Sequence, residues 1–352
     1  MLKLRRATVV SADPLEIELE GDGRPAGGNR RAWSDPVLIG PCEVGDELIV
    51  NTEALDLGLG SGGFDVVHVN LTRGLSAGGS DTEHVMKLNY SPLQHPVGTI
   101  EREVGEPRAG VRAPVLAIGL HGHLAPAAWA VADAAERLGE RPPRIGYVQT
   151  GGGALPGSLS RDVAELNDRG LIAAHVTAGP AYGGASEAIT LVGAIDATTA
   201  GELDGVIAGP GPGILGSATS YGHGGMVALD VLHAALALGA QAALCPRLSA
   251  ADARQRHRGL SHHSRAVLEL LLGGVDLPLP EVPGQIDMDE VSDLAVRLGA
   301  GRHRVTFEPV SLDAYAATGL PRRSMGRDLD EDPVFFAAAL AAGARLAELI
   351  AR

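Results

Sequence analysis

From residue 113 to the end of the chain, short apolar runs alternate with longer, alanine-rich segments. The apolar runs have about four to eight residues, a length typical of strands that are buried on both faces. They predict strands at 114–120, 144–150, 172–178, 204–209, 242–246 and 303–310. The segments between them predict helices at 127–139, 160–170, 183–200, 224–239, 261–273 and 332–352. This alternation predicts an α/β domain with a doubly wound, mostly parallel, Rossmann-like sheet and helices on both faces.

Residues 1–75 have a different pattern. Short β-branched or alternating runs such as LEIELE and FDVVHVNL are separated by Gly, Asp and Pro, which predicts a small antiparallel barrel or sandwich. Residues 76–112 read as a connecting segment. We therefore expect a β-rich domain over 1–75, a connection over 76–112 and the Rossmann-like domain over 113–352.

The predicted sheet also predicts where a ligand binds. In open parallel sheets, ligands bind beyond the carboxyl ends of the strands. Every loop that follows a predicted strand is long and rich in Gly, His, Arg, Ser or Asp, whereas most returning loops are short. The densest is RQRHRGLSHHSR (254–265), which follows the fifth strand.

Composition removes several classes of function. The 352-residue chain has a formal net charge of -14 and only 3% aromatic residues, which disfavours nucleic acid as a partner. No apolar run approaches the ~20 residues of a membrane span, so we expect no membrane partner. Two cysteines and no recognisable signal peptide favour the cytoplasm.

The segment GPGPGILGSATSYGHGG (209–225) follows a strand and precedes a helix. Glycine lets the backbone approach a ligand, and a helix N-terminus favours an anion. The candidate anion-binding residues are Gly211, Gly213, Gly216, Ser217, Thr219 and His223. A tight turn that only starts the helix is the alternative.

His121 and His123 lie at the end of the first predicted strand. Alternation along a strand puts both imidazoles on one face, where they could bind one divalent metal ion, as in the H-x-H of amidohydrolase barrels. His262, His263 and His223 lie in neighbouring loops and could join them. The alternative is that these histidines bind backbone carbonyls or ligand oxygens.

The fifth loop combines cations with titratable groups. Its arginines could bind a carboxylate or phosphate through two parallel N–H groups, or pair with acids of this acidic chain. Asp252 could hold one guanidinium or act as a base, and Ser261 could bind a ligand or cap the following helix. The candidate ligand-binding residues here are Arg247, Arg254, Arg256, His257, Arg258 and Ser261.

The blocks VMKLNYSPLQ (85–94), GPGPGILGSATSYGHGG and RLSAADARQRHRGLSHHSR resemble the bacterial domain-of-unknown-function family 3866. The resemblance would cover nearly the whole chain. The family name implies no activity, so it carries over no catalytic residue.

These patterns favour a hydrolase or group transferase that acts on a small anionic metabolite, phosphorylated or nucleotide-like. His121, His123, His262 or His263 would transfer protons, because imidazole titrates near neutral pH, with Asp252 as a further candidate. A non-catalytic anion sensor and a scaffold protein are the alternatives. We also expect a homo-oligomer.

Overall fold

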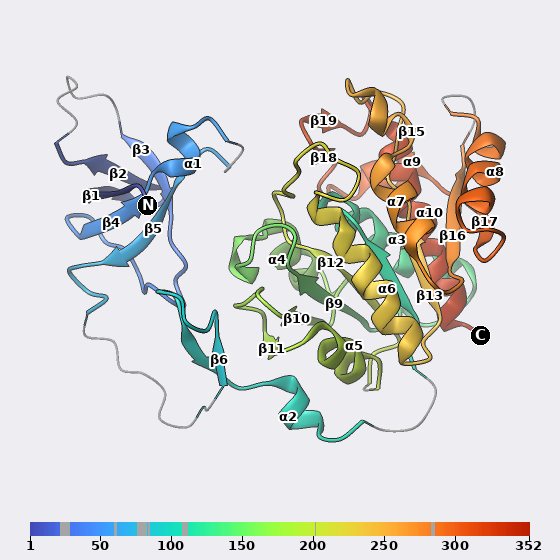
Figure 1. Cartoon of the computed structure of the whole chain (residues 1–352), viewed down its shortest axis with the longest axis horizontal. Helices are drawn as coiled ribbons and strands as arrows, with labels where there is room; N and C mark the ends of the chain where they lie inside the picture. The colour runs from blue at the N-terminus through green and yellow to red at the C-terminus, as the bar shows by residue number, and fades with distance from the viewer. Residues whose placement is uncertain are drawn as a thin grey trace. The chain divides into compact units, whose positions relative to one another are not determined.

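We describe the protein from a computed structural model (Figure 1). It describes residues 1–21, 29–59, 62–75, 83, 85–107, 112–200, 202–282 and 286–352. The chain forms two compact units, Met1–Val97 and Gly98–Arg352. Parts of the predicted connection, 76–82, 84 and 108–111, lie outside the described residues.

The first unit contains a closed five-stranded barrel. Its strands are β1 (Leu4–Ala12), β2 (Leu15–Leu19), β3 (Arg30–Trp33), β4 (Glu47–Asn51) and β5 (Asp65–Asn70), in the order β1-β2-β3-β5-β4. Alternate residues such as Ile17, Leu48 and Val50 fill the interior. The prediction of a small barrel is confirmed, although β3 and β5 pair in parallel. Helix α1 (Glu53–Asp56) and the hairpin of β6 (Val85–Lys87) and β7 (His95–Val97) complete this unit.

The second unit is built on an eight-stranded parallel sheet. Its order is β11-β10-β9-β12-β8-β13-β16-β17. The strands are β8 (Val115–Ile118), β9 (Ile145–Thr150), β10 (Ala174–Ala178), β11 (Ser186–Ala188), β12 (Gly205–Pro210), β13 (Ala242–Cys245), β16 (Asp276–Glu281) and β17 (Arg304–Pro309). The predicted parallel α/β sheet is confirmed.

Helices cover both faces of the sheet (Figure 1). One face carries α3 (Leu124–Arg137), α4 (Arg161–Asp168), α9 (Leu312–Ala317) and α10 (Pro333–Ile350). The other carries α5 (Leu191–Thr199), α6 (Val227–Ala237), α7 (His262–Leu270) and α8 (Met288–Leu298), with α2 (Ile100–Val104) beside α5. By length and composition α10 could cross a membrane, but 83% of it is buried within the unit, as in a core helix.

Several details of the second unit differ from the prediction. The segment 183–200 is not helical throughout, because Ser186–Ala188 extends the sheet as edge strand β11 before α5 begins at Leu191. Strand β16 and helix α8 were not predicted. The sequence of β16, DLPLPE, contains Pro278 and Pro280, which argue against a strand in a sequence pattern.

The connections make β8 a topological switch point. Strand β8 lies between β12 and β13. The chain leaves β8 toward α3 on one face, whereas it leaves β12 and β13 toward α6 and α7 on the other. Such a divergence opens a crevice beyond the carboxyl ends of the strands.

Candidate functional site

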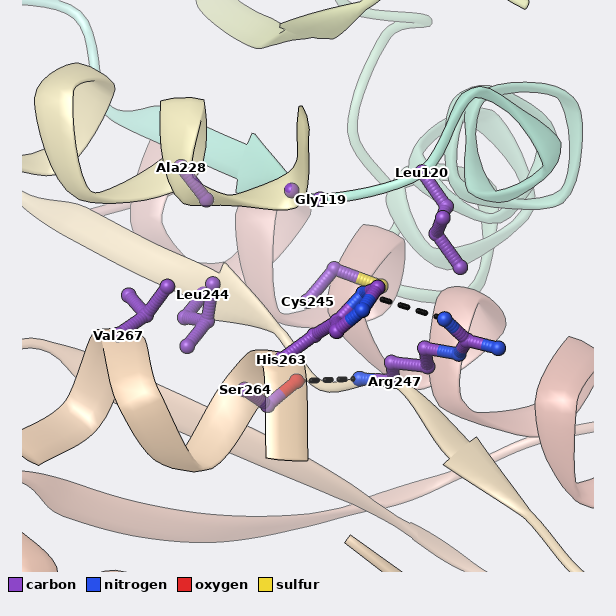
Figure 2. A pocket seen from close by; sticks show the side chains of 10 residues that line it. Gly119, Leu120, Ala228, Leu244, Cys245, Arg247, His263, Ser264 and Val267 are labelled. Carbon is purple, nitrogen blue, oxygen red and sulfur yellow. Dashed lines mark hydrogen bonds between the residues drawn. The ribbon is translucent and has the colours of Figure 1, made fainter. Parts of the chain in front are cut away.

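A small pocket occupies this crevice (Figure 2). Its volume is about 10 Å³, close to the size of one water molecule. Its polar lining comes from the segment after β13 and from the start of α7. Gly119, just after β8, and Gly225, just before α6, line it as well. The lining residues are Gly119, Leu120, Gly225, Ala228, Leu244, Cys245, Arg247, His263, Ser264 and Val267.

The fifth loop folds back over the end of β13. Short strands β14 (Leu248–Ser249) and β15 (Gly259–Leu260) pair antiparallel, so the intervening segment forms a tip. The tip contains a 3-10 turn, η4 (Gln255–His257). Arg256 is exposed on it, whereas His257 is 1% exposed and lies 2.7 Å from Ser261 Oγ through Nδ1. Ser261 caps α7 by accepting a hydrogen bond from the His263 amide, so the capping alternative for this serine holds.

Asp252 organises the arginines. This carboxylate is 1% exposed and accepts hydrogen bonds from Arg247, Arg254 and Arg327. Burial raises the pKa of Asp252, but hydrogen bonds from Arg254 and the charges of Arg254 and Arg327 outweigh burial and hold it well below its usual range. The geometry therefore favours the holding role of Asp252 over the role of a base. Arg258 donates from Nε to the Asp252 carbonyl.

The cations exceed the nearby carboxylates. Arg327 also donates to Asp332, whose other partners are Ser249 and the Ala250 amide. Three guanidiniums, those of Arg247, Arg254 and Arg327, thus share two buried carboxylates. Arg247 itself is 3% exposed, and burial lowers its pKa to about 10, so it stays charged at neutral pH. Its Nε has no hydrogen-bond partner within the described part of the chain.

Four imidazoles surround Arg247: His223, His257, His262 and His263, here named the α7 histidine group. Burial, and then the Arg247 charge, lower the pKa of His257 to about 3. Burial, and then neighbouring His223 and Arg256, lower that of His262 to about 4. The pKa values of His223 and His263 are also lowered, first by burial. The group is therefore neutral at pH 7, and the surplus positive charge is that of the arginines.

The hydrogen bonds fix which ring nitrogens are available. His223 Nε2 lies 3.1 Å from the Ser220 carbonyl, which only accepts, so Nε2 carries the proton and Nδ1 the lone pair. His263 Nδ1 accepts from Arg247 at 3.1 Å. His223 Nδ1 and His262 Nε2 are buried and have no hydrogen-bond partner among the described residues. Unsatisfied buried polar atoms are uncommon in proteins and point to a missing ligand, water or ion.

The ligand atoms of His223, His262 and His263 lie within 4.8 Å of one another, so these three residues could hold a metal ion. Two features oppose this. Arg247 places a positive charge next to His263, and the His223 and His263 rings are stacked with centroids 3.6 Å apart. Among the described residues, the three-residue group contains imidazoles and no carboxylate.

The glycine loop is arranged differently from the prediction. Gly213, Gly216, Ser217 and Thr219 are exposed, and the loop closes on itself: the Ser217 hydroxyl contacts Thr219 and the Gly222 carbonyl. Gly211 is buried, and a Cβ there would lie 2.4 Å from the Ala154 carbonyl oxygen. Of this predicted anion site, His223 belongs to the α7 histidine group, whereas the candidate glycines and hydroxyls do not line the pocket beside Arg247.

The expectation that His121 and His123 share a strand face is wrong. They lie in a 3-10 turn, η1 (His121–His123), after β8 has ended. His123 packs against Phe335 with ring centroids 4.4 Å apart, and both its nitrogens are buried without a partner among the described residues. Burial, and then the Arg247 charge, lower its pKa to about 3. His123 thus lies within electrostatic reach of the site.

His121 belongs to a second cluster, here named the β9 histidine group: His121, Tyr147, Gln149, Ser160 and His175. His121 Nδ1 lies 3.2 Å from the Pro210 carbonyl, so it carries the proton, and Nε2 accepts from Ser160 Oγ at 2.7 Å. Tyr147 stacks on His175, whose Nε2 donates to Gln149. Ser160 also caps α4 by accepting from the Val163 amide.

Sequence reasoning missed four residues of the site. Arg327 and Asp332 lie about 75 residues beyond Asp252 and reach the site only through the fold. Ser264 accepts a hydrogen bond from the Arg247 amide. Gly225 lies against the histidines: a Cβ there would be 3.2 Å from His223 Nδ1 and 3.4 Å from His263 Nδ1. The doublet GG after His223 was the available signal.

Comparison with known proteins agrees with the resemblance. A family model described as "Protein of unknown function (DUF3866)" matches residues 31–343. A search of the curated proteins and a search of the solved structures each find no match. The matched segment includes the whole crevice, from β8 to Asp332. Because the match covers most of its length, the chain belongs to the DUF3866 family.

Proposed function

We propose that the protein is a hydrolase or group transferase that binds the charged head of a small oxyanion, a phosphate or carboxylate, beside Arg247. The observation that carries the proposal is the surplus of guanidiniums over carboxylates around Asp252, where buried Arg247, partly exposed Arg327 and exposed Arg254 share two carboxylates. Positive charge in excess of its counter-charge is costly where it is shielded from water, so an anionic ligand would stabilise this arrangement. The partnerless Arg247 Nε is a donor available to it.

The backbone favours the same ligand. The turns and helices that begin with η1, with η3 (Gly224–Met226) and with α7 all start at this edge of the sheet. Their N-termini carry partial positive charge and favour anions. The cavity of about 10 Å³ admits one oxygen-sized group, so a larger head group requires its lining residues to move.

The chemistry would be proton transfer. His223 presents an unprotonated Nδ1, and its other nitrogen is held by the Ser220 carbonyl, as in an oriented general base. Such a base could activate water or a hydroxyl for attack on a bound ester. The described residues contain no dinucleotide-binding fingerprint at this edge, which leaves hydrolysis or group transfer as the favoured classes.

The proposal also covers the cellular location and the oligomeric state. Cys42 and Cys245 are both free, which fits a reducing cytoplasm. A homo-oligomer acting without nucleic acid or membrane completes the proposal, and size-exclusion chromatography with light scattering measures the oligomeric state.

Inorganic phosphate and p-nitrophenyl phosphate test the proposal. Arg247→Met should weaken phosphate binding about 10- to 100-fold in titration calorimetry, the effect of losing charged hydrogen bonds, and should abolish turnover of the ester. Asp252 keeps Arg254 and Arg327 in this variant, so the fold is retained. Arg345→Met is the matched control, because it also removes a buried arginine from an aspartate, Asp276, at the opposite edge.

Each outcome decides between the alternatives. Phosphate binding that depends on Arg247 but gives no turnover supports the anion sensor. Equal binding by wild type and Arg247→Met, or no binding by wild type, overturns the proposed site.

A further inference from the structure

We propose that His223, His262 and His263 bind a transition-metal ion of the zinc type. Nδ1 of His223 and Nε2 of His262 are the ligand atoms available without rearrangement. Both atoms are buried and have no hydrogen-bond partner among the described residues, and the three residues place ligand atoms within 4.8 Å of one another. This site shares its location with the proposed oxyanion site, but metal binding does not depend on turnover. The metal would occupy the Nδ1 lone pair of His223, so His223 can act as the proposed base only in the metal-free protein.

The tautomer of His223 is the one that a metal requires. Its Nε2–H is directed to the Ser220 carbonyl, which leaves the Nδ1 lone pair facing the group. Histidines that bind metals commonly donate their other N–H to a backbone carbonyl or carboxylate in this way. The donor set also selects the ion: imidazole nitrogens suit Zn²⁺, Cu²⁺ or Ni²⁺, whereas Mg²⁺ and Ca²⁺ prefer oxygen ligands.

Gly225 provides the space. A Cβ on this residue would lie 3.2 Å from His223 Nδ1 and 3.4 Å from His263 Nδ1. It would also lie 3.1 Å from the Gly119 carbonyl oxygen. Any larger residue would therefore crowd the Nδ1 atoms of both imidazoles.

His263 needs a rearrangement before it can bind. Its Nδ1 accepts a hydrogen bond from Arg247, and its ring is stacked on that of His223. The lone pairs of His223 and His263 therefore cannot both point at one ion until the two rings separate. We therefore expect His263 to contribute less affinity than His223 or His262. The Arg247 charge opposes a bare cation, so the open positions of the ion should take water, hydroxide or an oxyanion.

Zinc titration of the full-length protein after chelator dialysis tests this site. We expect one Zn²⁺ per chain, measured by competition with a chromophoric chelator, and a tetrahedral absorption band when Co²⁺ replaces it. His223→Gln and His262→Gln should each lower zinc affinity at least 10-fold, and His263→Gln by a smaller factor. Gly225→Ala should weaken binding while all three histidines remain, because its methyl group crowds the Nδ1 atoms of His223 and His263.

The control is His233→Gln, which removes a histidine of α6 outside the group and should leave zinc binding unchanged. Circular dichroism verifies the fold of each variant. No stoichiometric zinc in wild type, or full zinc binding by both His223→Gln and Gly225→Ala, overturns the proposal. Phosphate binding to the metal-free protein reports on the oxyanion site separately, so failure of one proposal is distinguishable from failure of the other.

Discussion

The two histidine groups belong to the same α/β unit and differ in how their nitrogens are satisfied. In the β9 histidine group, both nitrogens of His121 have partners, and His175 donates to Gln149. In the α7 histidine group, His223 Nδ1 and His262 Nε2 are buried without partners among the described residues. A satisfied network stabilises the fold by itself, whereas an unsatisfied one requires something else to bind.

The groups also differ in charge. The β9 histidine group has Asp162 near it, whose carboxylate oxygen lies 3.9 Å from His121 Nε2. In the α7 histidine group, His263 accepts a hydrogen bond from Arg247, which shares Asp252 with two further arginines. The comparison indicates that burial of imidazole at a strand end does not mark a functional site unless the hydrogen bonds are incomplete and the charge is unbalanced.

The largest effect is expected at Asp252. Asp252→Ala leaves Arg247 buried without its carboxylate and should lower the free energy of unfolding by about 3–5 kcal/mol, measured by urea denaturation. Asp162→Ala should cost less than about 1 kcal/mol, because this side chain is 28% exposed and burial already raises its pKa. Equal losses in the two variants would contradict the contrast in charge between the groups.

Acid should destabilise the protein through buried histidines. Burial lowers the pKa of His121 to about 4 and of His123 to about 3, from an ordinary value near 6.5. Between about pH 6.5 and 4 the unfolded chain binds more protons than the folded one, so the free energy of unfolding falls as the pH falls. The slope is about 1.4 kcal/mol per pH unit for each such histidine.

His123→Leu isolates one of these protons. Its ring nitrogens have no partner among the described residues, so the substitution should cost little free energy of unfolding at pH 7. Below about pH 6.5, the free energy of unfolding from urea denaturation should fall less steeply with falling pH than in wild type, by the contribution of one histidine. An unchanged slope in His123→Leu would show that His123 is not buried as a neutral imidazole.

Hydrophobic patterning sufficed for the α/β sheet, because strands buried on both faces leave a clear apolar signal. It failed at β16, where Pro278 and Pro280 lack N–H groups. The structure tolerates them because β13 pairs with β16 only at Ala243 and Asp276, so few ladder bonds are required on that side. It also failed at β11, a three-residue edge strand that is too short to show a period.

Residue types located the fifth loop at the carboxyl edge, and the structure places it there. They could not distinguish its buried part from its exposed part: Arg256 is exposed, whereas Asp252 and His257 are buried. They also predicted anion binding by the glycine loop, whose Ser217 and Thr219 hydroxyls form hydrogen bonds within the loop. Which imidazole nitrogen is left without a partner depends on the contacts that the fold makes, such as those of His223 with Ser220 and of His263 with Arg247, and residue types alone do not specify these.

The smallest expected change in stability is that of His262→Leu, and its comparison with His121→Leu tests the difference between the two groups most directly. His121→Leu removes the hydrogen bond to Ser160 and should lower the free energy of unfolding by about 1–2 kcal/mol. His262→Leu removes a buried nitrogen that bonds to nothing in the described chain, so metal-free stability should change by less than about 0.5 kcal/mol while zinc binding is lost. Urea denaturation and zinc titration of both variants provide the measurement. A residue that only stabilises the fold should affect stability, whereas a residue that binds a ligand should affect ligand binding. If His121→Leu instead loses zinc binding and His262→Leu loses stability, the assignments of the two groups are reversed.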